Sequence, residues 1–275
     1  MTYFSYPKIN ICLKILGILD SNYCDIFSRY RLVTNDVFDV MHIKDSSSFK
    51  IDGDFDCLVH ENLIFKAKEA LKTYLLSISS KKASYLESFQ IEVDKNIPTC
   101  SGLGGGSSNA ATYLLAFNEI LELSLTKEIL NSIASFLGAD VSFFIYRYLS
   151  ANVYGKGEII KSFDEENLEF SILTPPLKIK TKEIFNEFKK NFLNSPSFES
   201  KKAPKNPHLN LDLASFSNLQ SSFMLENYEI SFLNDLFPIA LKLYPILGDY
   251  AKDGYFFSGS GSSFFKIKNE NNSHK

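Results

Sequence analysis

The feature that most constrains this chain is a glycine-rich stretch between a strand pattern and a helix pattern. Residues 98–111 read PTCSGLGGGSSNAA and hold four glycines. Upstream, residues 89–93 alternate apolar and polar side chains, as a half-buried strand does. Downstream, residues 110–123 carry apolar side chains at helical spacing, and a Ser or Asn within 107–109 is expected to be the N-cap of that helix.

A glycine loop that joins a strand to a helix start predicts a phosphate-binding site. Glycine lets the backbone approach an anion closely, and the first N–H groups of a helix carry the positive end of its dipole. The loop is neither a Walker A motif nor a dinucleotide fingerprint, because it lacks Gly-Lys-Ser/Thr and has Ser107 in place of the third glycine. A flexible linker is the alternative. The candidate contacts are Pro98, Thr99, Cys100, Ser101, Gly102, Leu103, Gly104, Gly105, Gly106, Ser107 and Ser108.

Composition excludes several other classes of protein. The chain has 275 residues, with 45% hydrophobic and 22% charged side chains, which is typical of one large or two medium globular domains. A net charge of −3 gives no basic surface, so we expect no nucleic-acid partner. Cysteines without a C-x-x-C pair predict no zinc site. Without a signal peptide or a membrane-spanning run, we expect a cytoplasmic protein with no membrane partner.

The remaining pattern predicts mixed α and β structure. Strands are expected at 9–19, 28–33, 36–43, 49–52, 141–146 and 169–174, and two short strand-like runs flank a Gly-Ser turn within 255–267. Helices are expected at 60–76, 127–137, 181–190, 217–223 and 229–253, and Gly138 is expected to end the second of them. Residues 193–213 are expected to form a long loop and 269–275 a disordered tail.

Residues 102–111 resemble the phosphate loop of the GHMP small-molecule kinases. Three further segments resemble motifs of that family and follow its order, at 5–13, 137–144 and 255–267. The resemblance therefore extends over nearly the whole chain. It implies an α+β, two-lobed GHMP kinase fold with a β-rich N-terminal lobe (1–152), a ferredoxin-like C-terminal lobe (153–275) and the active site in the cleft.

The resemblance also implies which residues carry the chemistry. Lys8 and Asn10 match the family's Ala-Lys-Ile/Leu-Asn-Leu motif, with Pro7 in place of Ala, which makes Lys8 catalytic and Asn10 a substrate contact. Asp140 matches the catalytic base in Leu-Gly-Ala-Asp-Val-Pro-Phe-Phe, with Ser142 in place of Pro. From the residues alone, the favoured interpretation of Lys8 is a strand-edge lysine with its ammonium in water, and Asp140 can lie exposed in a turn. The resemblance reverses the interpretation of Lys8. ATP and Mg²⁺ are the implied cofactors.

The triple glycine followed by Ser-Ser-Asn-Ala-Ala resembles in particular the branch that phosphorylates 4-diphosphocytidyl-2-C-methyl-D-erythritol. The resemblance implies that Tyr23 stacks on the cytosine, and its alternative role is an aromatic side chain on the surface of a hairpin. The resemblance also places Cys24 where that branch has a histidine. A thiol replaces an imidazole poorly as a hydrogen-bonding group. Thr181 is expected both as an N-cap and as a substrate contact.

Two further residues are implied contacts of the nucleotide. Asn62 matches a position near the adenine, and its alternative role is the N-cap of the helix that follows. Lys95 matches a lysine that approaches the nucleotide, and its alternative is plain surface charge. Three other functions stay open from the sequence: another GHMP kinase (for homoserine, mevalonate or a sugar), a nucleotide-binding regulator without catalysis, and an interaction domain that uses residues 193–213.

Overall fold

The structure is a computed structural model that describes residues 1–35, 37–193 and 212–268. These residues form two compact units, each assembled from separate chain segments. Unit 1 comprises residues 1–7, 37–99 and 104–148, and unit 2 comprises 8–35, 100–103 and the described residues from 149 onward. The lobes expected from the sequence divide the chain at one point, whereas residues 8–35 group with the C-terminal half in unit 2.

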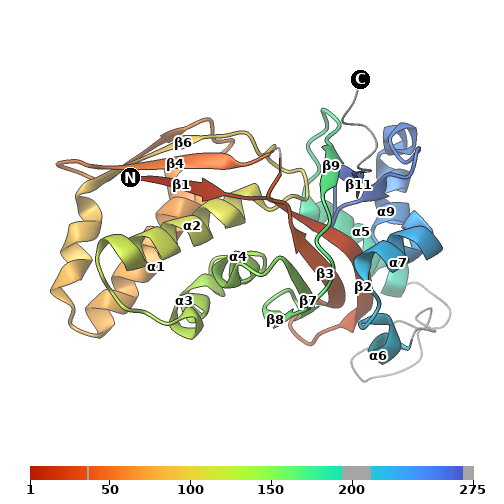
Figure 1. Cartoon of the computed structure of the whole chain (residues 1–275), viewed down its shortest axis with the longest axis horizontal. Helices are drawn as coiled ribbons and strands as arrows, with labels where there is room; N and C mark the ends of the chain where they lie inside the picture. The colour runs from red at the N-terminus through yellow and green to blue at the C-terminus, as the bar shows by residue number, and fades with distance from the viewer. Residues whose placement is uncertain (36, 194–211, 269–275) are drawn as a thin grey trace. The chain divides into compact units, whose positions relative to one another are not determined.

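Unit 1 is a four-stranded sheet with helices on one face (Figure 1). The strands lie in the order β1 (Thr2–Ser5), β4 (Asp39–Asp45), β6 (Phe89–Asp94) and β5 (Lys50–Gly53). β5 and β6 are parallel, and the crossover that this pairing needs carries α1 (Leu63–Ser77). α1 packs against α2 (Gly105–Ile120), which contacts β1 and β4. The other helices are η1 (Val59–Glu61), η2 (Lys81–Glu87), α3 (Lys127–Ala134) and α4 (Val141–Tyr146), where η denotes a 3₁₀-helix.

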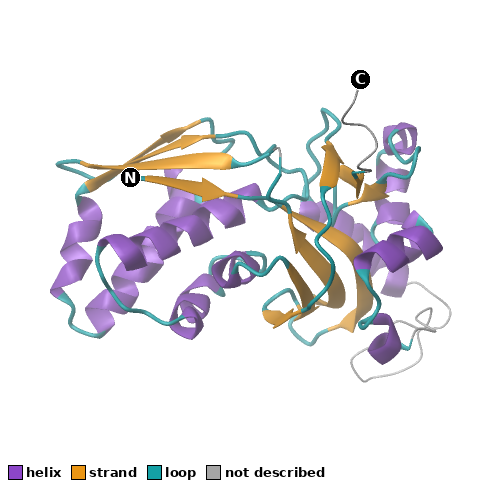
Figure 2. Ribbon diagram, viewed as in Figure 1, coloured by secondary structure: helices purple, strands orange, loops and turns teal. Residues whose placement is uncertain are grey.

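Unit 2 contains two antiparallel sheets and a set of short helices (Figure 2). The first sheet has the order β2 (Lys8–Ile18), β3 (Cys24–Leu32), β7 (Ser150–Gly155) and β8 (Ile159–Ser162). The second has the order β10 (Phe256–Phe257), β11 (Phe264–Ile267) and β9 (Phe170–Leu173). The helices are α5 (Thr181–Leu193), α6 (Leu213–Phe216), α7 (Ser221–Asn227), α8 (Ile230–Leu233), α9 (Phe237–Leu243) and η3 (Pro245–Asp249).

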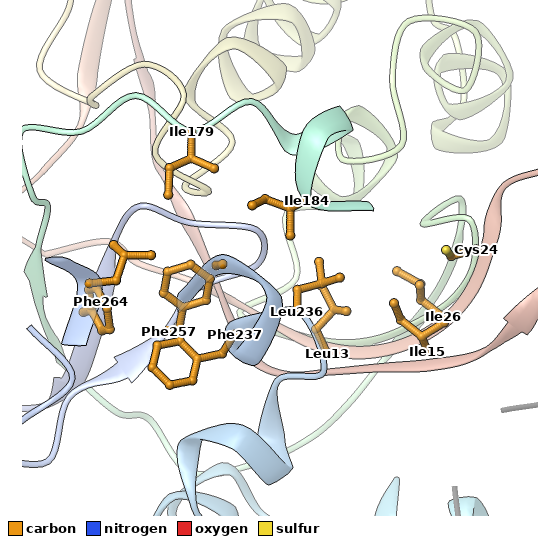
Figure 3. Packing of buried hydrophobic residues seen from close by; sticks show 12 residues of the cluster. Leu13, Ile15, Cys24, Ile26, Ile179, Ile184, Leu236, Phe237, Phe257 and Phe264 are labelled. Atoms are coloured by element: carbon orange, nitrogen blue, oxygen red, sulfur yellow. The ribbon is translucent and has the colours of Figure 1, made fainter. Parts of the chain in front are cut away.

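The apolar core of unit 2 draws side chains from both of its sheets and from its helices. Figure 3 shows Leu13 of β2 beside Leu236, with Phe257 and Phe264 of the second sheet grouped around Phe237. The Phe257 ring centroid lies 5.3 Å from that of Phe237 and 5.2 Å from that of Phe264. Burial of this apolar surface is the main favourable term for the unit, and it holds in place the strand that begins with Lys8.

Most of the predicted strands are confirmed, but one is wrong. Residues 141–146 form the helix α4, and five of its six residues are buried. A short apolar run buried on every side has no amphipathic period, so its period cannot separate a strand from a helix.

Two of the predicted helices end or continue differently from the observed ones. α3 ends at Ala134, so Gly138 is not its C-terminal glycine. The helix expected at 229–253 is broken into α8, α9 and η3. The residues 194–211 of the expected loop, and the tail 269–275, lie outside the described residues. No helix in the described part of the chain has the length and apolarity needed to cross a bilayer.

Candidate active site

The helix that follows the glycine loop begins inside the glycines. α2 starts at Gly105, and its N-cap is Gly104, which has a left-handed conformation with φ of 72°. The predicted caps Ser107, Ser108 and Asn109 are therefore wrong, because all three lie within the helix. No side chain caps the start of α2. The backbone N–H groups of its first turn are thus the groups that an anion can engage.

A buried ion pair links the segment before the glycine loop to α2. The Lys95 ammonium pairs with Asp39, and their side chains are 6% and 0% exposed. Asn109 joins both: its Oδ1 accepts from Lys95 at 2.9 Å and its Nδ2 donates to Asp39 at 2.9 Å. Asp39 also accepts from the backbone N–H groups of Asn96 and Ile97. Plain surface charge is therefore wrong for Lys95, and its contact with the nucleotide stays a prediction.

The first part of the loop packs against the Gly-Ser turn within residues 255–267, a segment that we call the third motif. Gly102 has φ of 80°, and a Cβ there would lie 2.4 Å from the Ser258 carbonyl oxygen, so the position needs glycine. Ser263 donates its N–H to the Ser101 carbonyl at 2.9 Å. Two sequence segments that lie far apart, and that each resemble a GHMP kinase motif, are thus in direct contact within unit 2.

Lys8 and Asn10 lie beside the same turn. The Lys8 ammonium donates to Asn10 Oδ1 at 2.7 Å and lies 4.6 Å from the centroid of the Tyr30 ring. The backbone N–H of Asn10 donates to Ser258 Oγ at 3.3 Å. Lys8 and Asn10 are 3% and 1% exposed, so this cation is held in a site with little water. An edge lysine with its ammonium in solvent is therefore wrong for Lys8.

The turn itself is held by Asn234, which no motif of the sequence indicates, and by Thr181. Asn234 donates to the carbonyl oxygens of Phe257 and Gly259, at 3.1 and 2.9 Å. Thr181, the first residue of α5, places its hydroxyl 2.8 Å from that of Ser260. Because α5 begins at Thr181, this residue is not the N-cap of the helix, and the predicted N-cap is wrong. Its contact with the substrate stays a prediction. Nothing in the sequence around Asn234 indicates its role, because the contact joins segments more than twenty residues apart.

Asp140 lies at the start of α4 in unit 1. It is half-buried, with φ of −75° and ψ of −18°, and its side chain does not cap the helix. The following N–H, of Val141, donates to the Gly138 carbonyl at 3.1 Å. The carboxylate is thus held on a short, buried helix rather than at the entrance to a strand.

The remaining residues that are predicted to contact substrate or nucleotide differ in solvent exposure. The Tyr23 side chain is 60% exposed, with the Lys156 ammonium 5.5 Å from its ring centroid. Cys24 is 6% exposed and belongs to the apolar core (Figure 3), and burial raises the pKa of its thiol to about 11. Asn62 is the N-cap of α1, with its Oδ1 accepting from Ile64 N–H at 2.8 Å. The structural role of Asn62 is confirmed, and its place near adenine stays a prediction.

Comparison with known proteins agrees with these motifs. A sequence model described as GHMP kinases N terminal domain matches residues 62–148. A protein of Sulfurimonas denitrificans named 4-diphosphocytidyl-2-C-methyl-D-erythritol kinase is 40% identical, with 98% of each chain covered. A Helicobacter pylori protein of the same name is 38% identical and covers 96% of this chain and 93% of its own.

Solved structures share the fold. The crystal structure of a 4-(cytidine 5'-diphospho)-2C-methyl-D-erythritol kinase superposes with a TM-score of 0.72 at 24% identity, covering 97% of this chain and 90% of its own. A mevalonate kinase superposes with a TM-score of 0.60 at 15% identity. The fold is common to both kinds of kinase, and the 38–40% identity over nearly the full length is what distinguishes this chain from the mevalonate kinases. The chain therefore belongs to the 4-diphosphocytidyl-2-C-methyl-D-erythritol kinase family and is a small-molecule kinase with the GHMP kinase fold.

Proposed function

We propose that the chain transfers the terminal phosphoryl group of ATP to the 2-hydroxyl of 4-diphosphocytidyl-2-C-methyl-D-erythritol, giving the 2-phosphate and ADP. The observation that carries the proposal is the 35–40% identity, over nearly the full length, to relatives that bear this name. The fold does not decide the substrate, because mevalonate kinases and a mevalonate diphosphate decarboxylase share it.

Phosphoryl transfer needs positioning, charge neutralisation and a group that accepts the hydroxyl proton. The uncapped start of α2 is suited to the phosphates of ATP, because its N–H groups and helix dipole favour an anion. Lys8 supplies a buried positive charge for the phosphoryl group. Asp140 accepts the proton of the acceptor hydroxyl. The proposal requires that Lys8 and Asp140 both reach the reacting atoms.

In this proposal Mg²⁺ binds together with ATP. Among the residues that the structure describes, no group of three or more His, Cys, Asp and Glu could hold a metal ion. Mg²⁺ is commonly bound through substrate phosphates with one or two carboxylates and waters, and there it neutralises phosphate charge. We therefore assign the ion chiefly to the oxygens of ATP rather than to a cage of side chains.

Recognition of the cytosine falls to Tyr23 in this proposal. Its ring is open to solvent at the β2–β3 turn and can stack on a pyrimidine face. Cys24, by contrast, packs with the apolar core, so we assign it to packing and not to hydrogen bonding with the base. Any hydrogen bond to the base would then come from groups other than Cys24.

A panel of phosphoryl acceptors tests the proposal. Release of ADP from ATP is measured with 4-diphosphocytidyl-2-C-methyl-D-erythritol, with homoserine and with mevalonate, each at the same concentration. We expect turnover only with the first, at a kcat/KM at least about a hundredfold above the others, since a site built for a polar substrate discriminates strongly. Faster turnover with homoserine or mevalonate, or no turnover with any acceptor despite ATP binding, would overturn it.

A further inference from the structure

We propose that Ser28 is a positioning residue, which fixes the amide of Asn10 and, through it, the ammonium of Lys8. The inference deepens the proposed function and rests on the role of Lys8 stated above. Ser28 lies on β3, where it is fully buried. Its hydroxyl is the hydrogen-bonding neighbour of Asn10 on the side away from Lys8.

The direction of the hydrogen bonds follows from what each group can donate. An ammonium only donates, so the atom of Asn10 that faces Lys8 at 2.7 Å is the amide oxygen. The amide nitrogen of Asn10 then donates to Ser28 Oγ at 2.9 Å. Ser28 has one proton, which it gives to the Cys12 carbonyl, and it therefore receives Asn10 with a lone pair. The chain Lys8, Asn10, Ser28, Cys12 has only one consistent direction.

The backbone geometry makes this chain possible. The register between β2 and β3 shifts between Asn10 and Cys12, so Ile11 is an extra residue in a β-bulge. A bulge bends a strand and changes the direction of its groups, and it lies here between the two β2 residues that Ser28 contacts. A Cβ at Gly259 would lie only 2.9 Å from Asn10 Oδ1, so the neighbouring turn can approach this amide oxygen closely because it has glycine there.

Loss of the Ser28 hydroxyl should act on chemistry rather than on ATP binding. In the Ser28→Ala variant the amide nitrogen of Asn10 is buried without its acceptor, which favours rotation of the amide and displacement of Lys8. We expect kcat to fall by about ten- to a hundredfold, because a small misplacement of a reacting group is costly. The KM for ATP should stay within about twofold, since Ser28 does not belong to the loop.

Three variants separate this role from packing. Ser28→Thr keeps the hydroxyl and should retain kcat within about threefold. Ser28→Cys fills the space with a weak hydrogen-bonding group and should behave like Ser28→Ala. Ser5→Ala is the matched control, because Ser5 is 1% exposed and its hydroxyl donates to Thr112 in unit 1, at 2.8 Å. It should lose a similar amount of stability and no turnover.

A double variant with Asn10→Ala gives the decisive readout. If Ser28 acts through Asn10, adding Ser28→Ala to Asn10→Ala should lower kcat no further, whereas independent effects multiply. Full multiplication, or a kcat of Ser28→Ala equal to that of Ser5→Ala, would overturn the inference. A crystal structure of Ser28→Ala adds a readout that needs no acceptor, and an unchanged contact of Lys8 with Asn10 in it would also overturn the inference. If the acceptor panel fails while that contact is lost, the proposed function alone is wrong.

Discussion

The two faces of the strand β3 carry two different buried polar networks. Successive side chains of a strand point to opposite faces, so Ser28 and Tyr30 share one face while Arg29 and Arg31 share the other. The first pair contacts Asn10 and the Lys8 ammonium. The second pair meets Glu165, through Arg29 at 3.1 Å and Arg31 at 2.9 Å.

The arginine face is built to hold unit 2 together. The side chains of Glu165 and Arg29 are both 0% exposed. Glu165 also accepts from the backbone N–H of Ser221 at 2.7 Å, and Arg29 donates to the Ser217 carbonyl at 2.9 Å. The network thus ties β3 to the connection that follows β8 and to the start of α7. Such a network contributes to stability only while every partner is present.

The comparison teaches that burial of charge alone does not mark a functional site. Both faces hold buried cations, yet Arg29 and Arg31 pair with Glu165, a carboxylate of the same unit that takes no part in the proposed reaction. The other face holds an ammonium beside the glycine loop and the Gly-Ser turn. Activity and stability should therefore respond to different faces of one strand, and this division can be tested.

The largest expected effect is the fall in kcat when the carboxylate of Asp140 is removed. We expect Asp140→Asn to lower kcat by about a thousandfold or more, because an amide cannot accept the proton of the acceptor hydroxyl. The variant should fold normally, since Asp140 is half-buried and does not cap α4. ADP release and thermal unfolding measure both quantities. A kcat within tenfold of the wild type would remove Asp140 from its role.

The next effect concerns the arginine face. Glu165→Gln should lower the free energy of unfolding by about 3 kcal/mol, because it leaves two buried guanidinium groups without their carboxylate. Glu166→Gln is the matched control, because Glu166 is an exposed neighbour, Arg31 bonds to its backbone carbonyl, and a glutamine oxygen can still accept from Ser222. Urea unfolding gives the comparison. Equal stability of the two variants would show that the network is not structural.

A smaller effect is expected at Tyr30, on the opposite face. Tyr30→Leu removes the ring under the Lys8 ammonium and should cost about 1 kcal/mol in the activation free energy, which is a several-fold loss of kcat. Tyr30→Phe keeps the ring and should lie closer to the wild type. If both variants lose turnover equally, the ring face is not what holds Lys8.

The smallest effect is a change in the pH dependence of stability. Burial by itself raises the pKa of Glu165, but hydrogen bonds from Ser150 and Ser221 and the charge of Arg29 outweigh it and hold the pKa below its ordinary value of 4.5. A lowered folded-state pKa stabilises the fold above the unfolded pKa, and this stabilisation is lost as the pH falls through the folded pKa. The wild type should thus lose more stability than Glu165→Gln on acidification below about pH 4.5. Parallel profiles would contradict this.

The sequence predicted the local elements and the motif order but not the contacts between distant residues. The pattern predicts the strand at 28–33, but it cannot show that one face meets Asn10 and the other meets Glu165, because those partners come from distant segments. Ser28 meets Asn10 across a bulge whose presence the period of two cannot reveal. Asp39, the partner of Lys95, lies 56 residues away along the chain.

The wrong local predictions also have physical reasons. Gly105 and Gly106 are poor helix formers, so the sequence pattern predicts that the helix starts at 110, whereas α2 starts at Gly105. In the structure a Cβ at Gly105 would lie 2.8 Å from Ile97 Cγ2, so close packing requires glycine in this first turn. Val141 and Ile145 favour strands by their branched side chains, but tertiary packing holds them in α4.

The most direct test of the account measures turnover and unfolding together for Lys8→Met and Glu165→Gln. We predict that Lys8→Met loses kcat by about a thousandfold while its free energy of unfolding falls less than that of Glu165→Gln. We predict the reverse for Glu165→Gln, with kcat per folded molecule close to that of the wild type. A Lys8→Met enzyme that retains turnover, or a stable Glu165→Gln enzyme that loses it, would contradict the division of β3 into a reactive and a structural face.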